Sequence, residues 1–460
     1  MWPTPSPTQA FVARRQKLRA RLDRPALIVS GFSRPRNFAH NLYPFRADSH
    51  FLYLVGQAIE GAALLLDPAG EDILFVPPPD PEEELWTGAM PTLEEVANKA
   101  GIQTRPIDEV HLPEGTLTLP AQDWEGAFFQ SELVGREIQA GAGANLEGED
   151  TRLADALIEL RLRHDDAGIA QLEQAARATA AAHLAGLAAT KPGRREAFVR
   201  AAMEGAFVGW GYRSSYNPIV TIHGEILHAT RYDGELLSGE LLLADVGAET
   251  PEGWAGDVTR TWPVSGRFSP TQRDLYQAVL EAQKAALAEV RPGVRYLEVH
   301  RAAGRALVKA LVALGIYKGD PLELYELGAA ALFFPHGVGH LLGLDVHDME
   351  DLGDRAGYAP GRKRSAVAGD RYLRLDRDLE ERMAVTIEPG FYQIPHLLDR
   401  PEEVGALEPH LDRNVLARYR DVRGIRIEDD VLVTREGARV LTAEIPKEVP
   451  DVEAAMRGEG

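Results

Sequence analysis

Five side chains in the C-terminal half of the chain are of types that could together hold metal ions. They are Asp245 in LLLAD, Asp257 in AGDVTRT, His340 in HGVGH, Glu388 in TIEPG and Glu428 in GIRIEDD. This mostly oxygen ligand set suits paired Mn²⁺-like ions better than a structural zinc, which prefers cysteine and histidine. Paired ions about 3.5–4 Å apart hold and activate a bridging hydroxide for hydrolysis. The residue types therefore indicate a metallohydrolase.

The two aspartates lie in a segment with the pattern of a β-hairpin. Residues 240–264 read as strand, turn and strand, and a hairpin symmetric about Pro251 would place Asp245 opposite Asp257. Directly opposed like charges destabilise a sheet unless something compensates them, and a bound metal pair does so. The alternative is that Asp245 caps or turns the chain while Asp257 lies exposed on a loop. Spacing alone leaves both interpretations open.

The segment from His336 to His340 contains two histidines separated by Gly-Val-Gly. An apolar run follows His340, so its ring is expected to be buried. Gly337 and Gly339 disfavour a helix, and the glutamate of the zinc-protease motif is absent, so a zinc-protease helix is not expected. Two ordinary loop histidines remain an alternative. Two further histidines, His228 and His347, suit substrate contact and proton transfer better than metal ligation.

The last two candidate ligands lie in short apolar runs. In GIRIEDD, strand alternation places Ile425 and Ile427 on one face and Arg426 and Glu428 on the other. A charged pair on a buried face is costly unless neutralised, so Arg426 is expected to be the charge partner of Glu428. Asp429 and Asp430 are interpreted as ordinary strand-end charges. A solvated edge strand could explain one such motif alone, but five coincidences favour the metal site.

Composition limits the class of protein. With 460 residues the chain is expected to form two domains, and its net charge of −20 argues against nucleic-acid and anionic-membrane partners. The absence of cysteine excludes disulfides, thiolate metal sites and cysteine nucleophiles. The first residues lack the features of a signal peptide, and no apolar run is long enough to span a bilayer. A cytoplasmic protein is expected.

The pattern of elements changes near residue 150. Before it, buried strands are predicted at 25–30, 62–66 and 72–76, and helices at 11–21, 82–89 and 93–100. Residues 141–148 read as a loop or linker. After it, helices are predicted at 151–163, 166–189, 194–207, 271–290 and 296–315, with a strand at 214–220. This alternation indicates an α+β or α/β layer architecture in which a sheet carries the site.

Taken in order, these motifs resemble the creatinase/aminopeptidase P/prolidase family. The resemblance implies an α+β protein, with a smaller α/β domain at residues 1–155 and a pita-bread domain at 156–460, whose curved antiparallel sheet is covered by helices. It implies that Asp245 binds one of two divalent ions, that Asp257 and Glu428 bridge both, and that His340 and Glu388 hold the other. Mn²⁺ is the expected metal, with Co²⁺ or Zn²⁺ as alternatives. The residues implied to line the substrate pocket or to support the ligands are His228, His336, His347, Tyr392 and Arg426.

Residues 41–56 and 84–88 resemble the N-terminal domain of aminopeptidase P. The resemblance implies a homodimer or homotetramer in which this domain reaches across a subunit interface and helps to shape the active-site mouth, with Trp86 as the candidate for that contact and for substrate binding. It also implies Xaa-Pro aminopeptidase activity on peptides with proline in the second position. Glu388 would pass the proton of the water to the leaving proline nitrogen, while His228 and His347 would hydrogen-bond the carbonyl or stabilise the tetrahedral intermediate.

Several alternatives within the same fold remain. The polar insert at 349–382 and the long stretch after Glu388 look more like prolidases, which cleave only dipeptides. Creatinase does not use the metals, and histone-binding modules of this fold typically lose ligands, whereas the ligand set here is intact. Methionine aminopeptidase would leave the large N-terminal domain unexplained. Xaa-Pro aminopeptidase is therefore preferred over prolidase.

Overall fold

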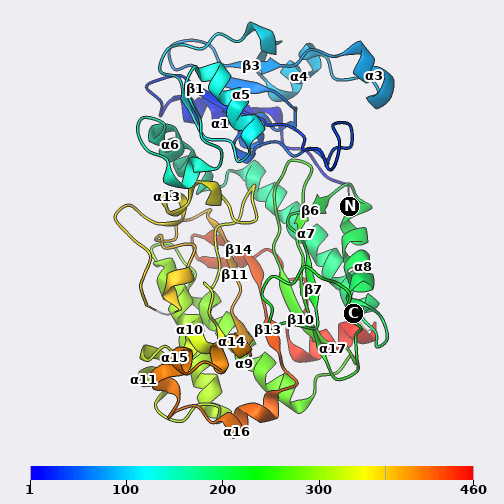
Figure 1. Ribbon diagram of the computed structural model, residues 1–460, viewed down its shortest axis with the longest axis vertical. Coiled ribbons are helices and arrows are strands. Elements are labelled where there is room, and N and C mark those ends of the chain that lie inside the picture. Colours follow the sequence, from blue (N-terminus) through cyan, green and yellow to red (C-terminus); the bar gives the residue numbers. More distant parts are fainter. Residues whose placement is uncertain (1, 368, 459–460) are drawn as a thin grey trace. The chain divides into compact units, whose positions relative to one another are not determined.

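The computed structural model describes residues 2–367 and 369–458, which form two compact units (Figure 1). The N-terminal unit is Thr4–Gln171 together with the segment Met349–Ala356. The C-terminal unit consists mainly of Leu172–Asp348 and the chain that follows Ala356. The boundary expected after residue 155 falls inside helix α6 (Thr151–Arg161), and the two units instead divide within the next helix, α7 (Asp166–Ala189).

A mixed five-stranded sheet forms the centre of the N-terminal unit, in the order β4-β3-β2-β1-β5. Neighbouring strands are antiparallel, except that β3 with β4 and β1 with β5 run parallel. The predicted strands at 25–30, 62–66 and 72–76 are confirmed as the three central ones, because their apolar side chains form a buried core. The strands are β1 (Ala26–Val29), β2 (Ala63–Leu66), β3 (Ile73–Val76), β4 (Gln103–Pro106) and β5 (Leu117–Thr118).

Helices accompany this sheet. A capping box fixes the start of α4, because the Thr92 hydroxyl accepts from the Glu95 N–H and the Glu95 carboxylate accepts from the Thr92 N–H. The helices of this unit include α1 (Thr8–Arg19), α2 (Ser49–Val55), α3 (Pro81–Thr87), α4 (Leu93–Ala100), α5 (Trp124–Val134) and α6, with 3₁₀ turns η1 (Ile107–Glu109), η2 (Ala142–Asn145) and η3 (Glu350–Leu352). The predicted helices at 11–21, 82–89, 93–100 and 151–163 are thus present with small shifts at their ends.

Short antiparallel strands carry the centre of the C-terminal unit. Three-stranded sheets in the orders β10-β8-β7 and β11-β14-β15 are accompanied by the pairs β12-β13 and β6-β9. The strands are β6 (Arg213–Ser214), β7 (Ile219–Thr221), β8 (Leu241–Asp245), β9 (Ala248–Glu249), β10 (Thr259–Pro263), β11 (Ala384–Ile387), β12 (Gly390–Tyr392), β13 (Gly424–Arg426), β14 (Asp429–Thr434) and β15 (Gly437–Val440). The strand predicted at 214–220 is divided into β6 and β7, with Pro218 between them.

Long helices flank these strands. In Figure 1 the strands lie between α7 with α8 (Glu196–Val208) and α9 (Pro270–Glu289) with α10 (Tyr296–Ala313). The predicted start of α9 is confirmed: the Ser269 hydroxyl caps the helix and Pro270 is its first residue. The expected mixed α+β architecture is therefore confirmed. The shorter elements of this unit are α11 (Pro321–Glu326), α12 (Ala329–Phe333), α14 (Pro395–Leu398), α15 (Pro401–Val404), α16 (Arg413–Leu416), α17 (Val449–Arg457), η4 (Asp370–Tyr372), η5 (Gly405–Leu407) and η6 (Ala417–Tyr419), whereas most of α13 (Asp354–Gly357) belongs to the N-terminal unit.

The predicted register of the β8–β10 hairpin is wrong. Asp245 pairs with Thr259, not with Asp257, because the turn is centred one residue later than Pro251. Asp257 lies just before β10, where the chain has left the regular ladder. The two aspartates therefore approach the same site from different points along the hairpin.

Among the described residues, the structure contains no helix that is both long and apolar enough to cross a membrane.

Candidate metal centre

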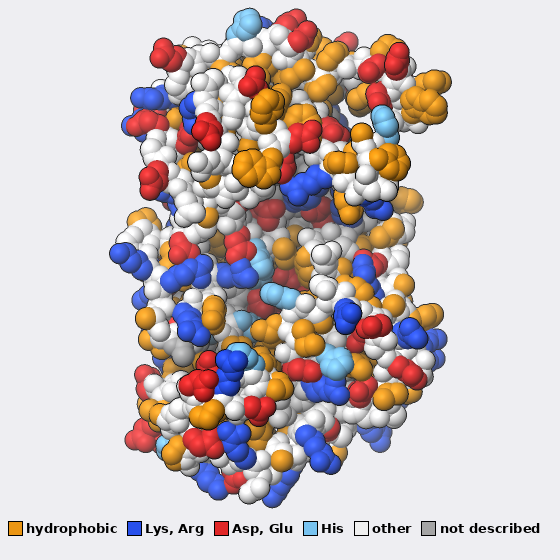
Figure 2. All heavy atoms as spheres, in the orientation of Figure 1, with side chains coloured by type: hydrophobic (Ala, Val, Ile, Leu, Met, Phe, Trp, Pro, Cys, Tyr) orange, Lys and Arg blue, Asp and Glu red, His pale blue; other side chains and the backbone are white. Residues whose placement is uncertain are grey.

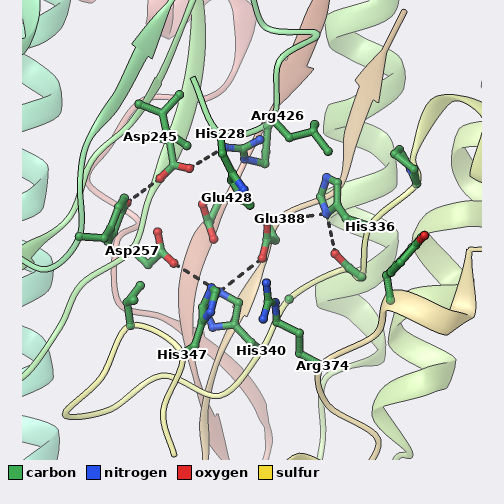
Figure 3. Close-up of a pocket in the computed structure, with 18 of the residues that line it drawn as sticks. His228, Asp245, Asp257, His336, His340, His347, Arg374, Glu388, Arg426 and Glu428 are labelled. Carbon is green, nitrogen blue, oxygen red and sulfur yellow. Dashed lines mark hydrogen bonds and ion pairs between the residues drawn. The ribbon is translucent and has the colours of Figure 1, made fainter. Parts of the chain in front are cut away.

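A pocket of about 650 Å³ opens within the C-terminal unit, among loops and strands that are far apart in sequence. Figure 2 shows histidine and acidic side chains in a hollow of this face, with basic side chains nearby. Figure 3 shows how the lining side chains point toward one another. The pocket brings together nine of the residues predicted from the sequence: His228, Asp245, Asp257, His336, His340, His347, Glu388, Arg426 and Glu428.

Three candidate ligands converge most closely. One ligand atom from each of Asp257, His340 and Glu428 lies within 4.8 Å of the others, and these side chains are 5%, 4% and 2% exposed. His340 Nδ1 donates to the Leu341 carbonyl at 3.0 Å, and Nε2 is the ring nitrogen that faces the carboxylates. This Nε2 lies 3.3 Å from Asp257 Oδ2 and 3.5 Å from Glu388 Oε1.

The backbone explains why His340 and Glu388 meet. The HGVGH segment runs beside β11: the Thr386 N–H donates to the His340 carbonyl, and the Glu388 N–H donates to the Val338 carbonyl. Gly339 has a φ of +156°, and a Cβ at this position would lie 2.2 Å from the Thr386 carbonyl oxygen. Only glycine permits this close approach. Gly339, the second glycine of HGVGH, therefore allows the neighbouring His340 to lie close to β11.

Buried negative charge accumulates at this centre. Burial, followed by repulsion from Asp257, Glu388 and Asp245, raises the pKa of Glu428 well above its ordinary value. Burial also raises the pKa of Glu388 to about 7, although His340 and Arg426 oppose the change. Converging acceptor atoms with this much repulsion need protons or cations between them. Oxygen-rich ligands with one imidazole therefore fit divalent metal ions.

Asp257 and His340 shift each other's pKa values in opposite directions. Burial alone would raise the pKa of Asp257, but the hydrogen bond and charge of His340 hold that pKa below its ordinary value. Burial would lower the pKa of His340, but Asp257 and Glu388 raise it. These opposite shifts show that Asp257 and His340 interact directly at the centre of the site.

The expected ion pair between Arg426 and Glu428 is wrong. Arg426 Nη2 instead donates to Asp245 Oδ2 at 2.5 Å, Nε donates to Thr259 Oγ1 at 2.9 Å, and Nη1 donates to the Tyr392 hydroxyl at 3.0 Å. The guanidinium reaches across to β8 because β13 lies beside β8 and β10. Arg426 therefore orients the candidate ligand Asp245.

Tyr392 does not line the pocket but supports it. Its hydroxyl accepts from Arg426 and donates to His336 Nε2 at 2.8 Å, because His336 Nδ1 donates to the Gly337 carbonyl at 2.8 Å. Burial, followed by the charge of Arg426, lowers the pKa of His336 to about 3. His336 is therefore neutral at physiological pH and held in one tautomer.

The remaining predicted residues differ in position. His347 packs its ring against that of His340, with 4.2 Å between the ring centroids, and His228 lines the same pocket. Trp86 belongs to α3 in the N-terminal unit, where its side chain is 83% exposed. It does not line the pocket of this chain.

The sequence analysis missed several residues of the site. Tyr216 donates from its hydroxyl to Asp245 Oδ1 at 2.5 Å, and Thr259 donates from its hydroxyl to Glu428 Oε2 at 2.7 Å. Thr259 could have been found, because it lies two residues after Asp257 on an alternating strand. No local signal marks Tyr216. The polar insert also contributes Arg364, Tyr372 and Arg374 to the pocket wall.

The interpretation of Asp429 and Asp430 as ordinary strand-end charges is wrong. Their side chains are 0% and 1% exposed, and each accepts hydrogen bonds from buried donors. Both faces of β14 are thus covered by protein where it begins.

The fold and the site together agree with the chain's matches to known families. The chain matches metallopeptidase family M24 over residues 170–435 and the N-terminal domain of aminopeptidase P over residues 11–113. The chain therefore belongs to metallopeptidase family M24.

Relatives of known name resemble the chain over most of its length. A probable Xaa-Pro aminopeptidase of Penicillium rubens is 34% identical over 89% of this chain and 88% of its own length. Xaa-Pro aminopeptidase 1 of Streptomyces coelicolor is 34% identical over 97% of this chain and 87% of its own. Two solved structures agree: Pseudomonas aeruginosa aminopeptidase PepP (30% identity, TM-score 0.81, 99% of both chains) and zinc-substituted Escherichia coli aminopeptidase P with product (31% identity, TM-score 0.80, 99% of this chain and 100% of that one).

Proposed function

We propose that this chain is a metal-dependent Xaa-Pro aminopeptidase, which hydrolyses the bond between an N-terminal residue and a following proline. The observation that carries the proposal is the convergence of Asp257, His340 and Glu428 within 4.8 Å, in a chain of family M24. Relatives that match both units are named Xaa-Pro aminopeptidases. That likeness favours an aminopeptidase over a prolidase.

Two divalent ions are proposed, held by Asp245, Asp257, His340, Glu388 and Glu428. The mostly oxygen donor set supports Mn²⁺ over Co²⁺ or Zn²⁺. When bound, such ions would polarise the scissile carbonyl and lower the pKa of water. Arg426 and Tyr216 hold the two oxygens of Asp245, and Thr259 holds one oxygen of Glu428. These contacts fix the carboxylates before a ligand arrives.

Glu388 is the proposed proton carrier. It lines the pocket, with Oε1 3.5 Å from His340 Nε2, so its carboxylate is placed to accept a proton from water and return it to the substrate. The leaving proline nitrogen belongs to a tertiary amide and must be protonated to depart. A carboxyl group beside the scissile bond supplies that proton.

The histidines are proposed to bind the substrate. His228 and His347 line the pocket from separate loops and can donate to the carbonyl oxygen as negative charge develops there. His336, held neutral by its contacts with Gly337 and Tyr392, contributes to the wall that receives the proline ring.

A homodimer or homotetramer and a cytoplasmic location are also part of the proposal. The exposed Trp86 on α3 supports a subunit contact, because a large aromatic side chain with no cover in its own chain is typical of an interface. The absence of cysteine is compatible with a reducing compartment.

The test compares Mn²⁺ content and hydrolysis for the wild type, Asp257→Asn, Glu428→Gln and the surface control Glu289→Gln. The first two variants should lose bound metal and activity together, whereas the control should retain both. Full turnover with an unchanged metal stoichiometry would contradict the ligand assignment. Assays on Xaa-Pro dipeptides beside Xaa-Pro-Yaa tripeptides test the substrate class: cleavage of tripeptides supports the proposal, and cleavage of dipeptides alone would make the chain a prolidase.

A further inference from the structure

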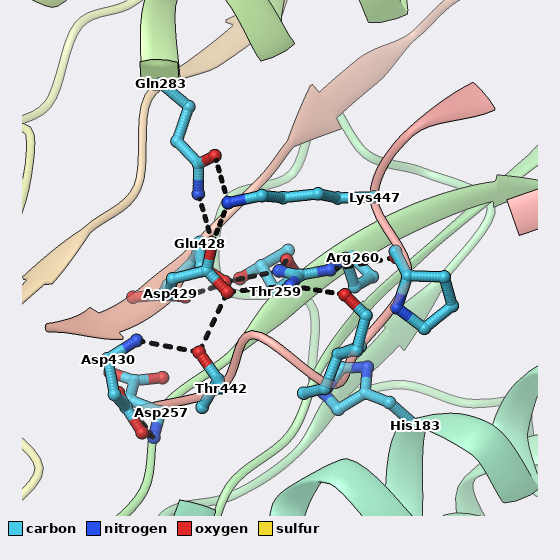
Figure 4. A network of polar contacts seen from close by, with 12 residues as sticks. His183, Asp257, Thr259, Arg260, Gln283, Glu428, Asp429, Asp430, Thr442 and Lys447 are labelled. Atoms are coloured by element: carbon cyan, nitrogen blue, oxygen red, sulfur yellow. Dashed lines mark hydrogen bonds and ion pairs between the residues drawn. The ribbon is translucent and has the colours of Figure 1, made fainter. Parts of the chain in front are cut away.

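A buried polar network lies beside the candidate metal centre and contacts the backbone of its ligands (Figure 4). It centres on Asp429, which directly follows Glu428 and is 0% exposed. One carboxylate oxygen of Asp429 accepts from Arg260 Nη2 at 2.7 Å and from the Thr442 hydroxyl at 2.8 Å. The other accepts from Gln283 Nε2 at 2.7 Å and from Lys447 Nζ at 2.5 Å. Both oxygens therefore have two donors each.

Arg260 connects this network to the chain that carries Glu428. Its Nη1 donates to the carbonyl oxygen of Glu428, and its other donors reach Asp429 and the carbonyls of Thr259, Ile445 and Pro446. The guanidinium is thus satisfied on every side at 2% exposure. Because Arg260 holds both the Glu428 carbonyl and the Asp429 carboxylate, the backbone that directly follows the Glu428 side chain is fixed.

Asp430 makes the corresponding contact to Asp257. Both of its carboxylate oxygens lie 3.2 Å from the Asp257 N–H, across a sequence separation of 173 residues. The Asp430 N–H in turn donates to the hydroxyl of Thr442, the residue that also donates to Asp429. The two halves of the network therefore join at Thr442. One half holds Glu428 and the other holds Asp257.

A network that only stabilised the fold would not need hydrogen bonds to the backbones of both Asp257 and Glu428. Buried charges are costly, and replacing them by apolar residues is often neutral or stabilising, so a fully paired cluster is weak evidence for stability alone. The residues it holds are the two whose ligand atoms lie within 4.8 Å of each other and of His340. Hydrogen-bond partners beyond a metal's ligands typically affect metal affinity about 10–100-fold.

We infer that Asp429, Asp430, Arg260 and Thr442 are positioning residues that set the spacing between Asp257 and Glu428 and thereby the affinity for the metal pair. Asp429 and Arg260 hold the Glu428 side of the site. Asp430 holds the Asp257 side, and Thr442 links the two sides because it hydrogen-bonds both Asp429 and Asp430. This inference rests on the proposed function, since it concerns the same metal site.

The experiment titrates the metal-free chain with Mn²⁺ at a temperature well below its melting point. Calorimetry gives the affinity, and the EPR spectrum of the loaded chain reports whether the bound ions are exchange-coupled. The variants are Asp430→Ala, which removes the acceptor for the Asp257 N–H, and Asp430→Asn, which keeps an acceptor oxygen. Leu311→Ala on α10, a buried apolar position, controls for loss of stability.

Asp430→Ala is expected to weaken Mn²⁺ binding about 10–100-fold and to change the coupled EPR signal. Asp430→Asn should remain close to wild type, and Leu311→Ala should lower the melting temperature without changing the affinity. If Asp430→Ala fails to fold, Thr442→Val carries the test, with a smaller loss of affinity expected. Wild-type affinity in Asp430→Ala, or in Thr442→Val where it is used, would overturn the inference. Failure of the wild type to bind Mn²⁺ would overturn the proposed function itself.

Discussion

Metal binding should release protons, because the metal-free site holds its excess negative charge partly by protonation. Burial and the neighbouring carboxylates raise the pKa of Glu428 well above its ordinary value, which favours the protonated form of this carboxyl group. Glu388, with a pKa of about 7, carries about half a proton at that pH. His340, whose pKa is also raised, adds to this amount. A metal ligand must be deprotonated, so binding should release at least about half a proton at pH 7, the share that Glu388 contributes.

The same protonation makes affinity depend on pH. Since Glu388 alone has a pKa of about 7, Mn²⁺ affinity should rise at least about twofold between pH 7 and pH 8, and more if the other ligands also release protons. Glu388 loses most of its proton across this interval, so the number of protons released should fall as the pH rises.

Calorimetry in buffers of different ionisation enthalpy measures the number of protons directly. The metal-free wild type is titrated with Mn²⁺ in two such buffers at pH 7 and again at pH 8. Because Glu388 has a pKa of about 7, its share of the released protons should fall by about 0.4 between the two pH values. Equal heats in both buffers for the wild type would mean that Mn²⁺ binding releases no protons, which would refute this prediction.

Three further predictions follow from contacts within the C-terminal unit. Burial lowers the pKa of His183 to about 3 in the folded chain, whereas the unfolded residue has a pKa near 6.5, so the free energy of unfolding falls as the pH drops through 6.5. His183→Gln should remove about 2–3 kcal/mol of the stability that the wild type loses between pH 7 and pH 4.5, measured from urea denaturation midpoints in EDTA. Parallel stability–pH profiles of the wild type and the variant would contradict this prediction. Arg426→Lys cannot keep all three hydrogen bonds, so kcat/KM should fall at least about tenfold, and an unchanged value would argue against a positioning role. Gly424→Ala would place a Cβ 2.3 Å from the Gly224 carbonyl, so thermal unfolding should show a loss of about 1–3 kcal/mol or more, and wild-type stability would show that this contact relaxes freely.

The candidate ligands could be predicted because each lies in a short motif with its own pattern. Glu388 and Glu428 end or interrupt apolar runs, and His340 precedes one, so each stands out as a polar residue in a buried place. The long helices α7, α9 and α10 were also predictable, since their apolar periodicity extends over several turns.

The partners of these residues could not be predicted, because they come from strands distant in sequence. Arg426 reaches Asp245 instead of Glu428, two residues away, since β13 lies beside β8 and β10. Alternation along one strand distinguishes a buried face from a solvated one, but at Asp429 and Asp430 both faces are buried. A single strand contains no information about which donors cover its second face.

The sequence separation between Asp257 and Asp430 has a consequence for how the chain folds. Their hydrogen bond joins positions 173 residues apart, and the Arg260 contacts with Glu428 and Asp429 span similar distances along the chain. Closing such long loops is slow, so the site is complete only after most of the C-terminal unit has formed. Metal that binds this late stabilises the native state without stabilising the transition state for folding. Loaded protein should therefore unfold more slowly than metal-free protein, while the two refold at similar rates.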